Sequence, residues 1–451
     1  MPSRISRWMR ALPDRYGRVT LVLLALIVAL GLGLRAYRVV EPLGSPGDDA
    51  HAYSALAETL YQEGSYGGPG FDGASDWSPG APLLYASAFY LTGGAREGTA
   101  RIVEALLGTA AIIVVFLLGR RIACRPTGLL GALGVAVYPP FIHSTGALFS
   151  EPPAVLTLPA AVLAFLWAAD RRSPYTWLLP GFLFGLTALI RPEYLVVGLA
   201  FAVLAALRVG RQLTWPRGLA AGAVLIAAFA APIIPWTVRN AVVLDRVVPI
   251  STGGGKALYV GTSLPADGDY ERVKALLVKR YLGRDLEPNS RALDAVNPTP
   301  LFDRVAARYP NLPRDSSLGK IGRENFSKYF GEDPIGYLGM TARKVWRMWS
   351  AGIGEAMGTA AGRVGQTLIV VLGLIGLVLL AYRKRWWEAA AMATPILLIT
   401  LVGAASLATP RRNEILMTLV FPLAGLAVSR AGAAISSSRV WPSRQASSPR
   451  S

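Results

Sequence analysis

Long apolar runs separated by short polar segments make up most of this chain. Roughly 16 to 20 apolar residues in a helix are enough to cross a bilayer. The pattern therefore predicts an all-α polytopic membrane protein with about ten transmembrane helices. The predicted spans cover residues 19–34, 103–118, 128–141, 154–168, 177–189, 195–207, 219–236, 367–381, 389–407 and 415–428.

One further apolar stretch, residues 81–91, is too short to cross the membrane at about 1.5 Å per helical residue. Counting it as a span would also move Arg120 and Arg121 to the outer side of the membrane and invert the sidedness of the basic loops that follow. We therefore expect a juxtamembrane helix that lies on the outer surface.

Composition supports the membrane interpretation, because 53% of the 451 residues are hydrophobic and only 16% are charged. The formal net charge of +18 is also found in proteins that bind nucleic acid. Here the basic residues lie between the apolar runs and do not gather on one soluble patch. The sequence therefore predicts membrane lipids as neighbours and no nucleic-acid partner.

Short loops that carry Lys and Arg stay on the cytoplasmic side of a membrane. If the chain crosses as predicted, every basic cluster falls on one side. These clusters lie at residues 4–18, 120–125, 171–172, 208–217, 383–385 and beyond 430. The sequence thus predicts a multi-pass protein of the cytoplasmic membrane with both termini in the cytoplasm.

The spans divide the chain into four parts. Residues 1–236 form an N-terminal transmembrane catalytic module that includes an external loop at 41–100, and residues 237–363 form an extracytoplasmic subdomain. Residues 364–430 hold the C-terminal transmembrane helices. Residues 431–451, rich in Ser, Arg and Pro, are predicted to be a disordered cytoplasmic tail.

Three carboxylates stand out on the predicted outer side. Asp48 and Asp49 follow the first span, where the chain emerges from the membrane. Glu151 begins the fourth span, just before Pro152 and Pro153. Capping of the helix N-terminus is one interpretation of Glu151. The other is a shared pocket in which one acid takes a proton from a hydroxyl group.

Several arginines break the positive-inside pattern, because they lie at the outer ends of spans. They are Arg191, Arg239, Arg411 and Arg412. Guanidinium groups in this position suggest a bound anion, and phosphate matches the planar fork of Arg. Snorkelling of single side chains to lipid headgroups is the alternative. For the whole set we favour a phosphate site.

A zinc site is not indicated. His51 and His143 are the only histidines, and they lack the ligand spacing of a zinc motif. Oxygen ligation of another divalent metal by Asp48, Asp49 and Glu151 stays open.

The chain resembles the GT-C glycosyltransferases, in the branch that contains the protein mannosyltransferases and the aminoarabinose transferase of lipid A. The resemblance rests on the order and sidedness of several short motifs. These are Gly47–Tyr53, Ser78–Tyr85, Ser150–Glu151, Leu189–Glu193, Pro235–Asn240, Pro249–Gly261, and Asp333–Pro334 followed by Lys344 and Trp346.

The resemblance implies an inverting transfer of one sugar from a polyprenyl-phosphate donor to an acceptor at the outer face of the membrane. Family members place a catalytic Asp-Glu pair in the first external loop, followed by Tyr. The spacing to Tyr53 makes Asp49 the equivalent of the family's base, and Ala50 replaces the family's Glu. Asp48 or His51 is then the candidate for the helper role.

The resemblance also suggests roles for other outer residues. Stabilisation of the leaving phosphate is expected of Arg411 or Arg412 and of Arg191, with Arg239 and Lys256 as weaker candidates. Glu151 would orient the acceptor or share a metal. Candidates for substrate contact are His51, Tyr53 and Tyr259. Lipid, polysaccharide and protein all stay open as acceptors.

Two other classes compete with a transferase. A transporter or flippase would place charges at mid-depth and show interrupted helices in related halves, and the sequence shows neither. The third reading is a non-catalytic subunit that binds carrier lipids in cell-envelope synthesis. It predicts that Asp49 tolerates replacement by Asn.

Overall fold

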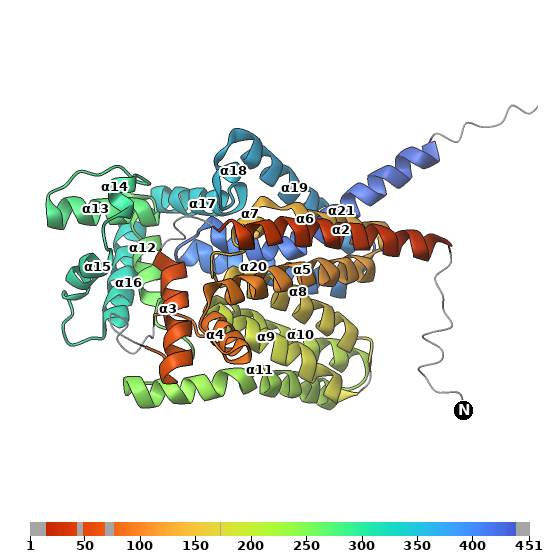
Figure 1. The fold of residues 1–451 in the computed structure, drawn as a ribbon, viewed down its shortest axis with the longest axis horizontal. Coiled ribbons are helices and arrows are strands. Elements are labelled where there is room, and N and C mark those ends of the chain that lie inside the picture. Colours follow the sequence, from red (N-terminus) through yellow and green to blue (C-terminus); the bar gives the residue numbers. More distant parts are fainter. Residues whose placement is uncertain (1–14, 43–47, 68–75, 172, 439–451) are drawn as a thin grey trace, which may run out of the picture.

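The computed structural model describes the backbone of residues 15–42, 48–67, 76–171 and 173–438, except that the side chains of 15–16, 48–49 and 433–438 lie outside the description. All regular elements in this part of the chain are helices (Figure 1). They form an elongated bundle with a second group of shorter helices at one end. The all-helical class predicted from the sequence is confirmed.

Eight helices in the described part are long and apolar enough to cross a membrane, so the chain is a multi-pass integral membrane protein. They are α2 (Arg15–Val40), α5 (Glu97–Ile122), α8 (Glu151–Ala168), α10 (Leu195–Gln212), α11 (Trp215–Leu244), α19 (Ala360–Tyr382), α20 (Trp386–Ala405) and α21 (Pro410–Ser438).

The two other predicted spans form shorter helices, so the expected number of about ten is corrected. These are α6 (Arg125–Val137) and α9 (Leu178–Ile190), each with 13 residues. At about 1.5 Å per residue each covers roughly 20 Å, less than the roughly 30 Å of a hydrocarbon core. Both nevertheless return the chain toward the end of the bundle from which α5 and α8 start, with the help of α7 (Pro139–His143) after α6 and η2 (Pro174–Trp177) before α9.

A proline pair and a buried arginine explain where α6 stops. Pro139 and Pro140 follow its last turn, and a residue before proline disfavours helical geometry. Arg35 of α2, fully buried, donates hydrogen bonds to Val135 O at 3.0 Å and Ala136 O at 3.3 Å. The guanidinium thus binds carbonyls at the end of α6 that have no partner within the helix.

The apolar stretch 81–91 forms α4 (Gly80–Thr92), which is not among the helices long enough to span. It lies beside α3 (Asp48–Glu63) at the end of the bundle (Figure 1). Gly80 packs directly on α9, because an added Cβ would lie 2.7 Å from Ile190 Cα. Next to it, the hydroxyl of Ser78 donates a hydrogen bond to Ile190 O at 2.6 Å. This end of α9 is therefore held by the chain before α4.

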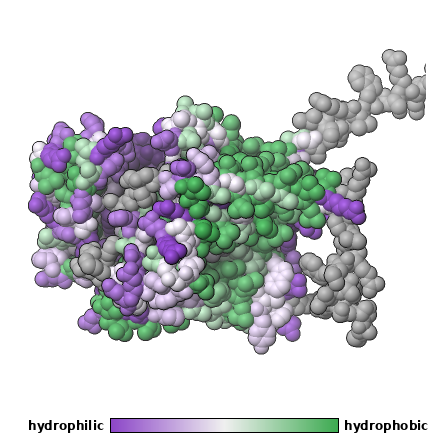
Figure 2. All heavy atoms as spheres, viewed as in Figure 1, coloured by the Kyte–Doolittle hydropathy of each residue, from purple (hydrophilic) through white to green (hydrophobic). Residues whose placement is uncertain are grey.

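The segment between α11 and α19 folds as short helices with an apolar core of their own, which includes Val260, Val278 and Phe302. The helices are α12 (Gly254–Gly261), η4 (Leu264–Ala266), α13 (Tyr270–Leu282), α14 (Arg291–Asp294), α15 (Thr299–Ala306), α16 (Arg314–Glu332), α17 (Pro334–Ser350) and α18 (Glu355–Gly358). Hydrophilic residues prevail over this end of the molecule, whereas the bundle is mostly hydrophobic (Figure 2).

Two predicted boundaries differ from the helix limits. Helix α11 continues past residue 236 to Leu244, and α21 continues through Ser438 into the segment expected to be disordered. The rest of that tail, residues 439–451, lies outside the described residues.

Lys344 joins the short helices to the bundle. Its side chain is fully buried on α17, and its ammonium donates to Gly261 O at 2.7 Å, Ser406 O at 2.9 Å and Ala404 O at 3.0 Å. Burial, and then the charge of Arg347, lower the pKa of Lys344 to about 8. At pH 7 the group therefore keeps three protons, one for each carbonyl.

Replacing Lys344 by Met is expected to lower the free energy of unfolding by about 3 kcal/mol, because three carbonyls lose a charged donor. The measurement is thermal unfolding of the full chain in nanodiscs. Lys279→Met is the matched control, since that side chain is 60% exposed and pairs with Asp285, itself 79% exposed. The control is expected to change stability by less than about 0.5 kcal/mol. Equal melting curves for both variants would contradict the role of Lys344.

Candidate active site

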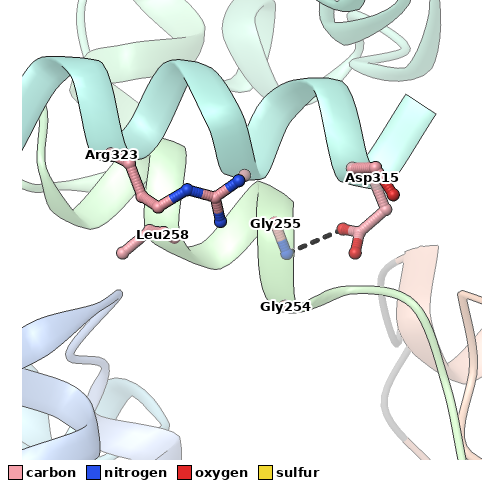
Figure 3. Close-up of a pocket in the computed structure, with 7 residues that line it drawn as sticks. Gly254, Gly255, Leu258, Asp315 and Arg323 are labelled. Atoms are coloured by element: carbon pink, nitrogen blue, oxygen red, sulfur yellow. Dashed lines mark hydrogen bonds between the residues drawn. The ribbon is translucent and has the colours of Figure 1, made fainter. Parts of the chain in front are cut away.

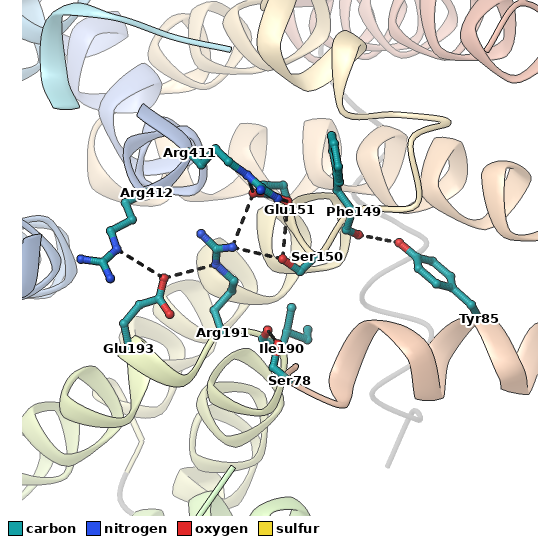
Figure 4. Close-up of polar contacts among 10 residues, drawn as sticks. All are labelled: Ser78, Tyr85, Phe149, Ser150, Glu151, Ile190, Arg191, Glu193, Arg411 and Arg412. Carbon is teal, nitrogen blue, oxygen red and sulfur yellow. Dashed lines mark hydrogen bonds and ion pairs between the residues drawn. The ribbon is translucent and has the colours of Figure 1, made fainter. Parts of the chain in front are cut away.

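Three helix ends bring a group of charged side chains together at one end of the bundle (Figure 4). Glu151 opens α8, Arg191 and Glu193 lie where α9 passes through η3 (Pro192–Tyr194) into α10, and Arg411 and Arg412 lie in the first turn of α21. We call these five residues the arginine–glutamate cluster.

Glu151 is the centre of this cluster. Its side chain is fully buried. Arg411 pairs with both of its oxygens, through Nε to Oε1 at 2.7 Å and Nη2 to Oε2 at 3.1 Å. Arg191 approaches from the other side, with Nη1 3.5 Å from Oε1 and 3.1 Å from the hydroxyl of Ser150. Glu151 is therefore more than a cap of α8, since it joins α8 to α21 and to the turn after α9.

Glu193 extends the cluster to Arg412. The carboxylate lies 3.2 Å from Arg191 Nε and 3.9 Å from Arg412 Nε, and Arg412 also donates to the hydroxyl of Ser406 at 3.2 Å. Burial by itself lowers the pKa of Arg191, but Glu193 and Glu151 outweigh this and raise it above its ordinary value.

The charge balance of the cluster is positive. Within these five residues, three guanidinium groups face two carboxylates, which leaves one net positive charge among side chains that are at most 28% exposed. The buried Glu414 of α21 lies near the same groups and is outside this count. A desolvated guanidinium surplus can bind an anion, and phosphate suits the fork of Arg. Of the four outer arginines that the sequence predicted to form one site, Arg191, Arg411 and Arg412 lie together in this cluster.

The two weaker phosphate candidates make other contacts. Arg239 of α11 lies over the rings of Trp236 and Tyr66, at 5.1 and 5.6 Å, and donates to Tyr66 O at 2.6 Å. Lys256 of α12 lies over the rings of Phe302 and Tyr270, at 4.9 and 5.1 Å. Both cations pack on aromatic rings outside the arginine–glutamate cluster.

The predicted acids of the first external loop cannot be placed as side chains. Asp48 and Asp49 begin α3, but their side chains lie outside the described residues. His51 is exposed on the same helix, whereas Tyr53 is buried and meets Trp77 edge to face at 5.4 Å. The assignment of Asp49 as base therefore stays a prediction.

Tyr259, the third candidate for substrate contact, lies in the short helices rather than in the cluster. Its ring meets Phe302 edge to face at 6.2 Å, and burial raises its pKa to about 12. No metal-binding group of three His, Cys, Asp or Glu side chains occurs among the residues the structure describes. The predicted metal site with Asp48 and Asp49 stays a prediction, because the side chains of these two residues lie outside the described part of the chain.

Glu104 and Tyr85 form a second buried polar site near Glu151, and the sequence predicted no role for either residue. Glu104 lies in α5 and is fully buried. Its Oε2 accepts hydrogen bonds from the backbone of Gly146 at 2.7 Å and Leu148 at 3.3 Å. Both residues have positive φ, at 84° and 54°. The carboxyl group thus holds the strained turn that leads to Ser150 and Glu151.

Tyr85 of α4 closes this site. Its hydroxyl lies 2.7 Å from Glu104 Oε1 and 2.6 Å from Phe149 O (Figure 4 shows the second contact). Burial, and then Glu104, raise the pKa of the Tyr85 hydroxyl, which therefore keeps its proton. The sequence signal that could have identified Glu104 is its position as a lone carboxylate inside an apolar run. Glu193 is the last residue of the Leu189–Glu193 motif, but the sequence predicted no role for it.

Known proteins share this architecture. Residues 76–236 match the family model described as dolichyl-phosphate-mannose-protein mannosyltransferase. Over this segment the chain is similar to that family. The segment contains Tyr85, Glu104, Glu151, Arg191 and Glu193, and the family resemblance inferred from the sequence is confirmed there. No curated protein matches the chain.

Solved structures match over nearly the whole chain. The oligosaccharyltransferase of Archaeoglobus fulgidus in the apo form is 15% identical, with a TM-score of 0.56 over 93% of this chain and 51% of that one. Archaeal oligosaccharyltransferase AglB from Archaeoglobus fulgidus, in complex with an inhibitory peptide and a dolichol-phosphate, is 15% identical, with a TM-score of 0.53 over 95% and 52%. ArnT from Cupriavidus metallidurans bound to undecaprenyl phosphate is 14% identical and covers 93% and 81%, with a TM-score of 0.40.

These likenesses show the fold. The chain spans about half the length of the oligosaccharyltransferases that it matches. The GT-C fold expected from the sequence is confirmed by the matches with TM-scores above 0.5.

Proposed function

We propose that this chain is an integral membrane glycosyltransferase, which transfers a sugar from a polyprenyl-phosphate donor to an acceptor at the outer face of the cytoplasmic membrane. The observation that carries the proposal is the arginine–glutamate cluster, with its surplus positive charge at the end of the bundle. The family match over residues 76–236 supports it, as does the dolichol-phosphate bound to a protein of the same fold.

The cluster would act on the leaving group. As the bond between the anomeric carbon and the phosphate oxygen breaks, negative charge grows on the phosphate. Arg191, Arg411 and Arg412 supply fixed positive charge at a site with little exposure to water. Glu151 is engaged by Arg411 and Arg191 through both carboxylate oxygens, so we assign it a positioning role rather than a metal-binding one.

The acceptor side of the reaction would use Asp49. The acceptor hydroxyl oxygen attacks the anomeric carbon from the face opposite the phosphate, and its proton passes to the Asp49 carboxylate. The products are the glycosylated acceptor, polyprenyl phosphate and a protonated Asp49. The configuration at the anomeric carbon is inverted.

The proposed sidedness follows from the two ends of the bundle. The end of the bundle opposite the cluster is where α5, α8, α10 and α19 finish. Arg120 and Arg211 lie in the last turns of α5 and α10, and Arg171 and Arg383 follow α8 and α19, so the positive-inside rule places this end in the cytoplasm. Both termini would then be cytoplasmic and the active site extracytoplasmic. Residues 237–363 would form the outer subdomain, apart from the end of α11.

The test is sugar transfer from a panel of radiolabelled polyprenyl-phosphate sugars to lipid, polysaccharide and peptide acceptors, with purified full-length protein. Wild type is expected to consume one donor, and Asp49→Asn is expected to be slower by at least about 100-fold. Glu58→Gln, an exposed position on the same helix α3, is the matched control and should equal wild type.

Other outcomes point to the competing classes. Transfer that survives in Asp49→Asn would overturn the assignment of the base. Consumption of no donor, together with carrier-lipid binding that the Asp49→Asn variant retains, would favour the non-catalytic subunit. Movement of a lipid-linked sugar across a vesicle membrane without transfer would favour a flippase.

A further inference from the structure

A cavity of about 320 Å³ lies between α12 and α16, in the group of short helices (Figure 3). None of its lining residues belongs to the arginine–glutamate cluster. Its size falls at the lower end of the range for small-molecule sites. The cavity is therefore large enough for one small polar ligand and too small for a polyprenyl chain.

Glycine backbone forms the floor of this cavity. Gly254 and Gly255 come from α12 and Gly319 from α16. The two helices touch at Gly255, because an added Cβ there would lie 1.9 Å from Asp315 O. At Gly254 an added Cβ would meet nothing within 4 Å. The lining thus has open space at Gly254, and Leu258 is the single apolar side chain that lines the cavity.

A carboxylate and a guanidinium face the cavity from two sides (Figure 3). Asp315 is held in place because its Oδ1 accepts hydrogen bonds from the backbone of Gly255 at 2.8 Å and Lys256 at 3.2 Å. Arg323 folds back along α16, so that its Nη1 lies 3.8 Å from the position of a Cβ on Gly319. The hydroxyl of Ser316 adds a donor and acceptor to the lining.

This set of groups selects a ligand class by charge. A phosphate or sulfate would be repelled by Asp315, and a metal cation by Arg323. An apolar ligand would desolvate both charges without pairing them. A neutral polyhydroxylated ring can pair with both charged groups. Its hydroxyls would donate hydrogen bonds to Asp315 and accept them from Arg323, while one face of the ring lies on the glycines.

We propose that this cavity binds one sugar residue of the acceptor or of the glycosylated product, outside the catalytic centre. The assignment to acceptor or product rests on the proposed glycosyltransferase function. The binding of a sugar by itself does not rest on that function, because it is inferred from the residues that line the cavity.

The experiment is saturation-transfer NMR on the full-length protein in nanodiscs, with the methyl pyranosides of mannose, glucose, galactose and arabinose as probes. At least one probe is expected to receive saturation from wild type. Gly254→Leu adds a bulky side chain to the lining of the cavity without a backbone clash, and it and Arg323→Gln should each reduce that transfer at least threefold. Gly331→Leu, at an open position on the same helix α16, is the matched control and should bind like wild type.

A fourth variant separates this cavity from the catalytic centre. Arg411→Met alters the arginine–glutamate cluster and should leave probe binding unchanged. The proposal is overturned if Gly254→Leu binds like wild type, if binding is lost only in Arg411→Met, or if no probe binds. If the protein transfers no sugar but binds a probe in a way that depends on Gly254 and Arg323, the result would count against the proposed function and would still support this sugar-binding site. Thermal unfolding of each variant shows that it is folded.

Discussion

Glu151→Gln is expected to slow sugar transfer by about 100-fold and to lower the free energy of unfolding by about 3 kcal/mol. The first effect follows because Glu151 orients Arg411 and Arg191, and loss of a positioned charged donor at a developing anion costs 10²- to 10³-fold. The second follows because removing one partner of a buried ion pair leaves the other uncompensated. Initial rates with a polyprenyl-phosphate sugar and thermal unfolding in nanodiscs measure the two effects.

Controls separate the two effects. Glu332→Gln changes an exposed carboxylate at the end of α16 and should alter neither rate nor stability. The double variant Glu151→Gln with Arg411→Met removes both partners of the closest pair, so it should recover part of the stability without recovering activity. A Glu151→Gln enzyme with the wild-type rate would show that the cluster is structural only.

The second large effect is expected at Glu104, where two substitutions should diverge. Glu104→Leu removes the acceptor for the backbone N–H groups of Gly146 and Leu148. Each buried donor left without a partner costs about 1–3 kcal/mol, so we expect a loss of about 3 kcal/mol. Because the same turn leads to Glu151, transfer should also fall by at least tenfold.

Glu104→Gln is expected to stay within about 1 kcal/mol of wild type, for a reason of proton counting. Tyr85 has one hydroxyl proton but lies within 2.7 Å of two oxygens, Glu104 Oε1 and Phe149 O. Both contacts are hydrogen bonds only if position 104 donates to Tyr85 while Tyr85 donates to Phe149 O. A glutamine amide can donate there and still accept from Gly146 and Leu148.

Thermal unfolding and transfer rates of the two Glu104 variants, beside Tyr85→Phe, check this arrangement. Tyr85→Phe leaves Phe149 O without its donor and should cost about 1–2 kcal/mol. A Glu104→Gln variant as unstable as Glu104→Leu would show that the site needs a carboxylate. Stability of Glu104→Leu equal to that of wild type would remove the positioning role altogether.

The long spans could be predicted from sequence because the signal is local. A helix such as α5 or α19 buries its own backbone hydrogen bonds, so membrane insertion depends mainly on apolar length. The same criterion failed for α6 and α9. Their apolar runs end at Pro139 and near Arg191, and neighbouring helices and buried polar contacts complete the packing, which no window of sequence records.

The arginines of the site were predictable as exceptions to a rule. Arg191, Arg411 and Arg412 stood out because they broke the positive-inside pattern, and the fold brings them together around Glu151 and Glu193. Arg239 broke the same pattern and packs on Trp236 and Tyr66 instead. Sidedness places a residue at one end of the bundle but does not say which helix ends meet there.

The sequence by itself determined the membrane-spanning class of this protein, the approximate positions of its long helices and the kinds of charge at the two ends of the bundle. These depend on apolar length and on loop charge, which are properties of short segments. Only the tertiary structure decided that Glu193 joins Arg191 to Arg412, that Glu104 and Tyr85 hold the turn before Glu151, and that glycines open a cavity between α12 and α16. Each of these depends on which helices pack side by side, and the free energy that selects their neighbours is spread over contacts between residues far apart in the chain.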